Sequence, residues 1–434
     1  MSDVTLAPPR DPFGPAQKFE DAKPRKSRKN NPLWMIAQGI ASLRLTVALL
    51  FLSILLVFFG TLAQVDGGIW HIVSDYFRSF VVWIPFDIFT VFASEKSPLP
   101  GGFPFPGGWT IGALLLTNLF AAHAMRFRLR VGILLIHSGL VVLLLSEFVT
   151  GMYAVEMNMD IYEGDSTNFA YDTREVELAV IDPSDPDQNR VVVIPQSRLV
   201  SGEKITHELL PFDITVDEFY FNSAIVRLKH GERSRATFGD GRFYRAEPKQ
   251  IVPGAGASQG VDFPSAYVSL TKKGSDTPLG TCLVSAFFDV PARKHWEVIG
   301  QPKSVGGTEY QLHLRFKRYY KPYEVYLVDF THDVYKNTTI PKDFKSHVQI
   351  FEGSSDDFRE EKIWMNNPLR YSGETFFQSA FKPGNTGTVL QVVRNPGWLM
   401  PYISCAMVSL GFLVHFPQVL FRFLRRQMAA TRVS

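Results

Sequence analysis

The sequence predicts a membrane protein with four transmembrane α-helices, three and then one, and a large, mainly β extracytoplasmic domain between the third and the fourth. Two observations predict this fold class. Four apolar stretches with almost no charge are long enough, or nearly so, to cross the ~30 Å hydrocarbon core of a bilayer. Residues 151–396, in contrast, carry ordinary amounts of charge and repeated two-residue alternation, which is typical of β-sheets with one wet face.

The predicted spans are residues 44–64, 109–126, 130–150 and 397–421. Basic clusters flank them: Arg25, Lys26, Arg28 and Lys29 before the first, Arg126, Arg128 and Arg130 between the second and third, and Arg422, Arg425 and Arg426 after the last. Basic residues accumulate on the cytoplasmic side of membrane proteins. We therefore expect both tails, residues 1–43 and 422–434, to be cytoplasmic, and the large domain to be periplasmic in a bacterial inner membrane.

The middle of the loop of residues 65–108 is apolar and rich in aromatic residues, but charged residues and a proline interrupt it. Asp75, Arg78, Pro85 and Asp87 interrupt its apolar run, and Trp83 suits the headgroup layer. We expect an interfacial helix or hairpin here, with a fifth span as the alternative.

Strand-like alternation is clearest in two segments of the large domain. In residues 175–182 (EVELAVID) and 311–317 (QLHLRFK), apolar and polar side chains alternate. The second pattern predicts that Leu312, Leu314 and Phe316 are buried and that His313 and Arg315 lie on the wet face. The domain could form one large sandwich or two smaller lobes, and the sequence leaves both open.

Composition excludes several function classes. The net charge of +3 is too small to suggest nucleic acid binding, and the two cysteines form neither a CxxC nor a CxxCH motif. A disulfide between Cys282 and Cys405 is not expected, because one lies in the β domain and the other in a span. Motifs of hydrolases, ATPases and metalloproteases are also missing.

Three histidines, His123, His137 and His415, lie inside apolar stretches. An ionisable ring at membrane depth needs a partner or a task, and imidazole is a common ligand of haem iron. His137 follows Arg130 by seven residues and His415 precedes Arg422 by seven, so both rings are expected about 10 Å inside the cytoplasmic ends of their helices. Equal depth is what two axial ligands on one iron require.

Each histidine also has an ordinary explanation. His123 precedes Arg126 by three residues and could extend towards the interface. A buried histidine could instead bond a serine or a carbonyl group. His415 shares a helix face with Ser404, Val408 and Gly411, and these small side chains predict that this face meets another helix.

Several segments resemble the ResB family, also called CcsB. These are SLRLTVALLFLSILLVFFGTLAQ in the first span, GILLIHSGLVVLLLSEFVTGMY in the third, MNMDIYEGDS after it, and VVRNPGW before the last span. The most specific match is MNNPLRYSGETFFQSAF, which has the family residues Asn367, Pro368, Leu369, Tyr371, Gly373, Gln378 and Ser379 in place.

The resemblance implies cytochrome c biogenesis of the system II type. Proteins of this family bind the membrane protein CcsA (ResC), and together they export haem and attach it to CxxCH motifs of apocytochrome c. His137 stands at the family's histidine position, which implies a transmembrane haem ligand. Its partner would be a histidine of CcsA or of this chain, with His415 and His123 as candidates.

By the same resemblance, the cofactor would be a transient, bis-imidazole haem b, and no other metal site is expected. The chain would be a non-catalytic or co-catalytic subunit of a holocytochrome c synthetase complex. It departs from the expected pattern in Glu147, near the outer end of the third span, and lacks an outer cysteine placed to reduce an apocytochrome. The alternatives are a membrane-anchored β scaffold without haem and a b-type electron-transfer subunit.

Overall fold

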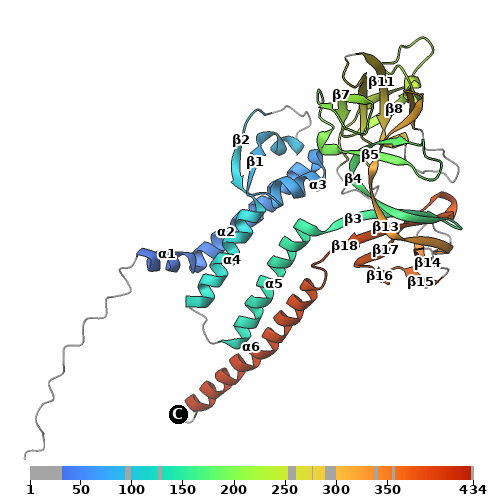
Figure 1. The fold of residues 1–434 in the computed structure, drawn as a ribbon. Helices are drawn as coiled ribbons and strands as arrows, with labels where there is room; N and C mark the ends of the chain where they lie inside the picture. The colour runs from blue at the N-terminus through green and yellow to red at the C-terminus, as the bar shows by residue number, and fades with distance from the viewer. Residues whose placement is uncertain are drawn as a thin grey trace, which may run out of the picture.

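The computed structural model describes residues 32–92, 99–125, 130–252, 261–275, 277–288, 300–336, 341–353 and 357–431. The basic residues Arg25, Lys26, Arg28, Lys29, Arg126 and Arg128 lie outside these ranges. Within them, four helices are long and apolar enough to cross a membrane: α2 (Leu43–Gly67), α4 (Gly108–Met125), α5 (Val131–Tyr153) and α6 (Met400–Thr431). A mainly β domain lies between α5 and α6 (Figure 1), so the predicted fold class is confirmed.

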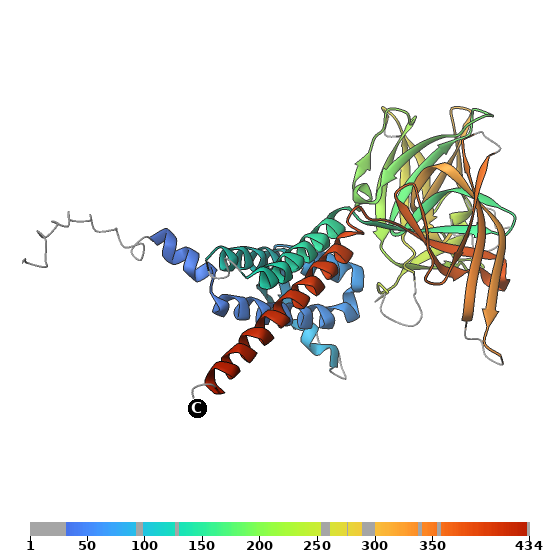
Figure 2. The same ribbon diagram turned by 90° about the horizontal axis from the view of Figure 1, so that it is seen from below.

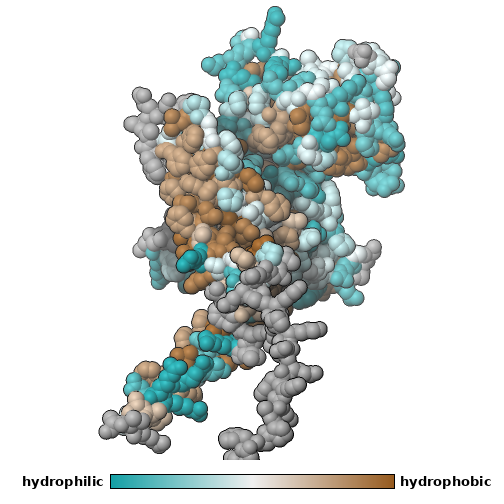
Figure 3. Space-filling model, turned by 90° about the vertical axis from the view of Figure 1, so that its left-hand side faces the viewer, coloured by the Kyte–Doolittle hydropathy of each residue, from teal (hydrophilic) through white to brown (hydrophobic). Residues whose placement is uncertain are grey.

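The helices and the β domain occupy opposite ends of the molecule (Figure 2). On the side shown in Figure 3, the apolar colour is concentrated over the helices and the hydrophilic colour over the β domain. α6 continues to Thr431, beyond the predicted end of its span at residue 421. Its 32 residues correspond to about 48 Å of helix, more than the ~30 Å hydrocarbon core requires.

A short helix, α1 (Pro32–Ile40), precedes α2, and the chain turns at Ser42. The Ser42 hydroxyl accepts a hydrogen bond from the backbone N–H of Arg44 at 3.2 Å and so caps α2. Asn118 of α4, only 3% exposed, donates to the carbonyl oxygens of Ile40 (2.5 Å) and Ser42 (3.1 Å). It accepts from the Thr46 hydroxyl at 2.6 Å. The Ser42 carbonyl also accepts from the backbone N–H groups of Leu45 and Thr46. Asn118 therefore matters most for the carbonyl of Ile40, because lipid offers no hydrogen-bond donor to a backbone group.

After α2 the chain forms a compact unit of helix α3 (Ile69–Ile72), π-helical turn η2 (Val73–Phe77), strand β1 (Val81–Pro85), 3₁₀ turn η3 (Phe86–Phe92) and strand β2 (Gly102–Pro106). The two strands pair as an antiparallel hairpin. Phe59 of α2 anchors this unit through edge-to-face contacts with Phe89, Phe103 and Phe105, with ring centroids 5.9, 5.8 and 5.4 Å away. The expected hairpin is thus present, while its depth in a bilayer stays a prediction.

Helices α5 and α6 pack closely along small residues. A Cβ atom added to Gly139 would lie 2.6 Å from Val408 Cγ2, and one added to Gly411 would lie 2.8 Å from the backbone nitrogen of Ile136. The Ser404 hydroxyl donates to the carbonyl oxygen of Gly139 at 2.7 Å. The prediction that this face of α6 meets another helix is confirmed, and that helix is α5.

The described part of the β domain contains two large hydrophobic cores joined by two long strands, β4 (Ser166–Asp182) and β13 (Thr308–Val334), and a smaller buried cluster of Ala236, Tyr267, Leu283 and Phe288. The N-terminal half of β13 contributes Leu312 and Leu314 to the first core, and its C-terminal half contributes Val325 and Leu327 to the second. Of the two architectures that the sequence allowed, the structure therefore has two lobes.

In the first lobe, the sheet order is β11 (Pro278–Ser285), β10 (Ser265–Lys272), β7 (Phe212–Tyr220) and β6 (Lys204–Ile205). This sheet shares its core with β4, β13, β5 (Arg190–Pro195) and β12 (Gln301–Val305), and β8 (Ser223–Arg227) pairs with β9 (Tyr244–Pro248). Cys282 is buried here, Cys405 is exposed on α6, and both are free, so the expectation that they form no disulfide with each other is confirmed.

In the second lobe, the path runs β15 (Phe358–Trp364), β14 (Pro341–Glu352), β13, β4, β3 (Val155–Tyr162), β18 (Gly387–Arg394), β17 (Glu374–Phe381) and β16 (Leu369–Tyr371). The two ends of the path, β15 and β16, are consecutive in the chain and joined by residues 365–368. The sheet therefore curls around its core until its ends meet.

The alternation in residues 311–317 predicts only part of the burial. Leu312, Leu314 and Phe316 are buried as predicted, but Arg315 is also buried, at 4% exposed. The reason is its cross-strand neighbour on β4: Glu177 accepts a hydrogen bond from Arg315 Nε at 2.9 Å. A buried charge is tolerated because it is paired, so the predicted wet face is dry at this point.

Candidate functional site

Two of the three span histidines lie together, on helices α4 and α5. His123 is in the last turn of α4, and its Nε2 shares a hydrogen bond with Nδ1 of His137 on α5. The ring centroids are 4.6 Å apart and the ring planes meet at 80°. Such a bond requires that one nitrogen carries a hydrogen and the other accepts it, so the two imidazoles fix each other's orientation.

His415 lies on a different side of α5. A Cβ atom added to Gly132 would be 2.8 Å from the Cβ of His415 and 2.9 Å from its Cα and N. His137 follows Gly132 by five residues, which places it about 7.5 Å further along α5 and roughly 140° around it. The backbone of His415 is therefore level with Gly132 and not with His137, and it lies on a different side of α5 from His137.

The imidazole pair has the donor set that haem iron takes from proteins, one ring nitrogen from each of two helices. In the structure the two rings touch, so no space for an iron porphyrin exists between them. A haem bound by both rings would require them to separate. The hydrogen bond that would be lost is worth about 1 kcal/mol net, which a metal–nitrogen bond can readily replace.

Other donor sets are lacking in the part of the chain that the structure describes. There, no group of three or more His, Cys, Asp or Glu side chains could hold a metal ion. The thiol of Cys282 is fully buried, and burial raises its pKa, which keeps it in the unreactive protonated form. Among the described residues, the His123–His137 pair is therefore the best candidate for a metal-binding or reactive site.

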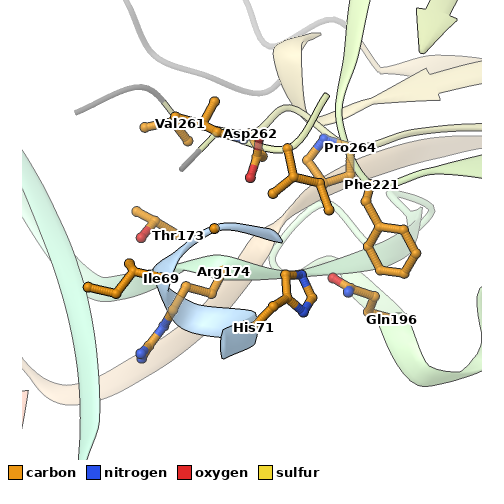
Figure 4. A pocket seen from close by; sticks show the side chains of 12 residues that line it. Ile69, His71, Thr173, Arg174, Gln196, Phe221, Val261, Asp262 and Pro264 are labelled. Carbon is orange, nitrogen blue, oxygen red and sulfur yellow. Dashed lines mark hydrogen bonds between the residues drawn. The ribbon is translucent and has the colours of Figure 1, made fainter. Parts of the chain in front are cut away.

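A second histidine site lies where α3 meets the first β lobe (Figure 4). His71 and Asp262 line a cavity of about 150 Å³ together with Arg174 and Phe221, and the His71 and Phe221 rings meet edge to face at 6.4 Å. Burial raises the pKa of Asp262, although the backbone N–H of Val252 donates to its carboxylate at 2.9 Å and opposes this shift. Ligand cavities usually measure 300 Å³ or more, so this cavity is too small for haem. It is a small gap at the contact between α3 and the first β lobe.

Two contacts join the second lobe to the helices, and sequence reasoning missed both. The Arg370 guanidinium stacks on the Trp398 ring at 3.7 Å from its centroid, between β16 and the start of α6. Asn395 donates to the Thr150 hydroxyl at 3.2 Å and accepts from the Gly397 N–H at 2.8 Å. Asn118 was missed as well, although a lone amide in an apolar stretch is a signal for a buried polar contact.

The family-like segment of residues 365–381 serves the fold of the second lobe. Glu374, 6% exposed, accepts hydrogen bonds from Lys321 Nζ at 2.6 Å and the Tyr323 hydroxyl at 2.9 Å. Gln378 accepts a hydrogen bond from the Ser346 hydroxyl on β14 at 2.5 Å and donates to the Thr388 hydroxyl on the neighbouring strand β18 at 2.9 Å. Of the family residues, Gln378 therefore has a clear hydrogen-bonding role in this lobe.

Comparison with known proteins gives two matches. The sequence model of the ResB-like family matches residues 303–389, from β12 to β18. Protein NrfI of Wolinella succinogenes is 34% identical over 92 residues, which are 21% of this chain and 10% of NrfI. The matched part of the chain thus spans about a tenth of that relative. Both matches show that part of this chain is similar to the ResB-like family or to NrfI.

Proposed function

We propose that this protein is a subunit of cytochrome c biogenesis. With a CcsA/ResC-type membrane protein, it transports haem across the bacterial inner membrane and supports haem attachment to CxxCH apocytochromes. The similarity of residues 303–389 to the ResB-like family supports the role in biogenesis. The observation that carries the haem step is the pair of imidazoles from α4 and α5 in contact with each other within apolar helices.

Haem is the substrate in this proposal, and it enters from the cytoplasmic leaflet. His137 supplies one axial nitrogen, because its helix also carries the family-like third-span sequence. The second comes from His123 or from a histidine of the CcsA-type partner. The geometry favours His123 over His415, because His123 already faces His137. Lipid and packed helices exclude water around the rings, which strengthens binding of the haem.

The orientation and the outer steps belong to the same proposal. The basic clusters favour cytoplasmic termini and a periplasmic β domain. In that orientation, the ring pair lies near the cytoplasmic side, and haem moves outward to the CcsA-type protein. The two-lobed domain then docks that protein or presents the reduced apocytochrome.

One observation favours a scaffold without haem as the second candidate. The two rings bond each other directly, and a purely structural pair that joins α4 to α5 would have the same geometry. A b-type electron carrier, the third possibility, would share the haem but not the biogenesis role.

A visible spectrum separates these functions. The full-length protein is purified with and without the CcsA-type partner, as wild type and as His137→Ala. We expect a bis-imidazole Soret band that is lost in the variant and returns with added imidazole. A colourless complex would favour the scaffold. Reversible redox cycling with a quinone, together with normal cytochrome c levels after deletion of the gene, would favour the electron carrier.

A further inference from the structure

The hairpin β1–β2 has one blocked edge and one open edge. Gly107 N donates to Phe80 O at 2.9 Å, and Phe86 N donates to Gly101 O at 3.0 Å. In an antiparallel ladder, residues that bond the partner strand alternate with residues that point away. On β2, the outward positions therefore include Pro104 and Pro106, which have no N–H. Prolines on an edge strand prevent another strand from pairing there.

The outward positions of β1 are different. By the same alternation, Val81 and Trp83 direct their N–H and C=O groups away from β2, and both residues have an N–H to donate. β1 pairs with β2 in a sheet of two strands. Among the described residues, the outward backbone groups of Val81 and Trp83 have no hydrogen-bond partner. The two residues are 67% and 59% exposed, and their unpaired outward backbone groups make this the open edge of the hairpin.

A hollow of about 640 Å³ lies along this open edge. It is lined by four residues of β1, by η2 and by the start of η3, and by no residue of β2. The β1 residues include Val82, which faces the core, as well as Val81 and Trp83, which face outward. A hollow that touches both faces of a strand lies beside its edge, where an additional strand would lie.

The charge of the hollow is negative. Asp75 and Asp87 line it, no basic side chain does, and neither carboxylate has an ion-pair partner in the part of the chain that is described. Tyr76, only 4% exposed, also lines it, and its hydroxyl has no hydrogen-bond partner among the same residues. Burial and the carboxylates of Asp75 and Asp87 raise the pKa of Tyr76, and all three residues line the same hollow.

We propose that the open edge of β1 binds an extended, basic segment of the unfolded apocytochrome as a third strand. Val81 and Trp83 supply the backbone hydrogen bonds, and Asp75, Asp87 and the Tyr76 hydroxyl receive a lysine or arginine side chain. Strand addition binds a chain without a sequence requirement, and an unfolded chain has the free backbone groups that it needs. The identity of the segment rests on the proposed function. The preference for an extended basic chain rests on the hollow alone.

The test uses full-length protein in nanodiscs and a fluorescent, reduced peptide that carries CxxCH flanked by lysines. A matched peptide has glutamates in place of the lysines. We expect wild type to bind the lysine peptide, with affinity that falls as salt rises, and to bind the glutamate peptide much more weakly. Val81→Pro removes one outward N–H without touching the β1–β2 bonds, and it should weaken binding about fivefold. Val81→Ala keeps the N–H and should bind like wild type.

Charge variants keep the proposal testable if Val81→Pro does not fold. Asp75→Asn with Asp87→Asn should weaken binding several-fold and reduce its salt dependence, whereas Asp185→Asn with Asp187→Asn, in an exposed loop of the β domain, should change neither. Equal binding of both peptides, or no effect of either β1 or charge variants, would overturn the proposal. The proposal would also be overturned if the charge variants no longer bound the CcsA-type partner but bound the peptide as wild type does. A normal Soret band without peptide binding refutes this inference alone, and peptide binding by a colourless complex refutes the haem function alone.

Discussion

The close approach of α5 and α6 at Gly132 is expected to be essential for the stability of the helices. In Gly132→Ala, the new Cβ would meet the Cα and N of His415 at 2.9 Å, while ordinary contacts begin at 3.4 Å. These atoms belong to the backbone, so rotation of a side chain cannot relieve the clash. The two helices must move apart by roughly half an ångström, and overpacking of this kind destabilises proteins by about 1–3 kcal/mol.

Gly112→Ala on α4 is the matched control, because a Cβ there would meet no atom within 4 Å. Alanine also favours helix over glycine by up to about 1 kcal/mol, and the control contains this gain without the clash. The assay is reversible unfolding of the full-length protein in mixed micelles by added SDS, followed by circular dichroism. We expect Gly132→Ala to be less stable than Gly112→Ala by about 1–3 kcal/mol. Equal stability of the two variants would refute the close packing.

Three further predictions concern the polar interior. Lys321→Met leaves the buried carboxylate of Glu374 without its cation and should destabilise the β domain by about 3–5 kcal/mol, while Lys321→Met with Glu374→Gln should recover part of this in denaturant unfolding. Burial and two neighbouring arginines lower the pKa of His313 to about 4. As the pH falls, the imidazole of His313 is therefore protonated at a higher pH in the unfolded chain than in the folded protein. The free energy of unfolding should thus decrease between about pH 6.5 and pH 4, by at most ~3 kcal/mol, and His313→Gln should make this decrease smaller. Asn118→Leu removes the amide donor to the carbonyl oxygens of Ile40 and Ser42 and should lower stability in SDS unfolding by about 1 kcal/mol; no change would show that the amide is dispensable.

The sequence was sufficient to predict the spans and the helix seam. Runs of apolar residues without charge have one stable solution in a bilayer, so four spans followed directly. The small side chains of Ser404, Val408 and Gly411 repeat on one face of α6, which is a local signal for close packing. Such signals depend on the period of one element and need no knowledge of its neighbours.

The histidine pairing could not be predicted in this way. His123 and His137 are separated by fourteen residues on two helices, and their contact depends on how α4 rotates against α5. Depth estimated from flanking arginines suggested His137 with His415, but depth carries no information on rotation around a helix. The same limit applies to Arg315, whose burial depends on the cross-strand position of Glu177, and to the two lobes, which follow from strands long enough to enter two cores.

The haem function is tested by the visible spectrum of the full-length protein co-purified with its CcsA-type partner in three variants. We predict that His137→Ala loses the Soret band and regains it with added imidazole. We predict that His123→Ala weakens the band, and that His415→Ala retains it, because His415 of α6 contacts α5 at Gly132, on a different side from His137. A full Soret band in His137→Ala would contradict haem ligation by the imidazole pair, as would a band that depends on His415 alone.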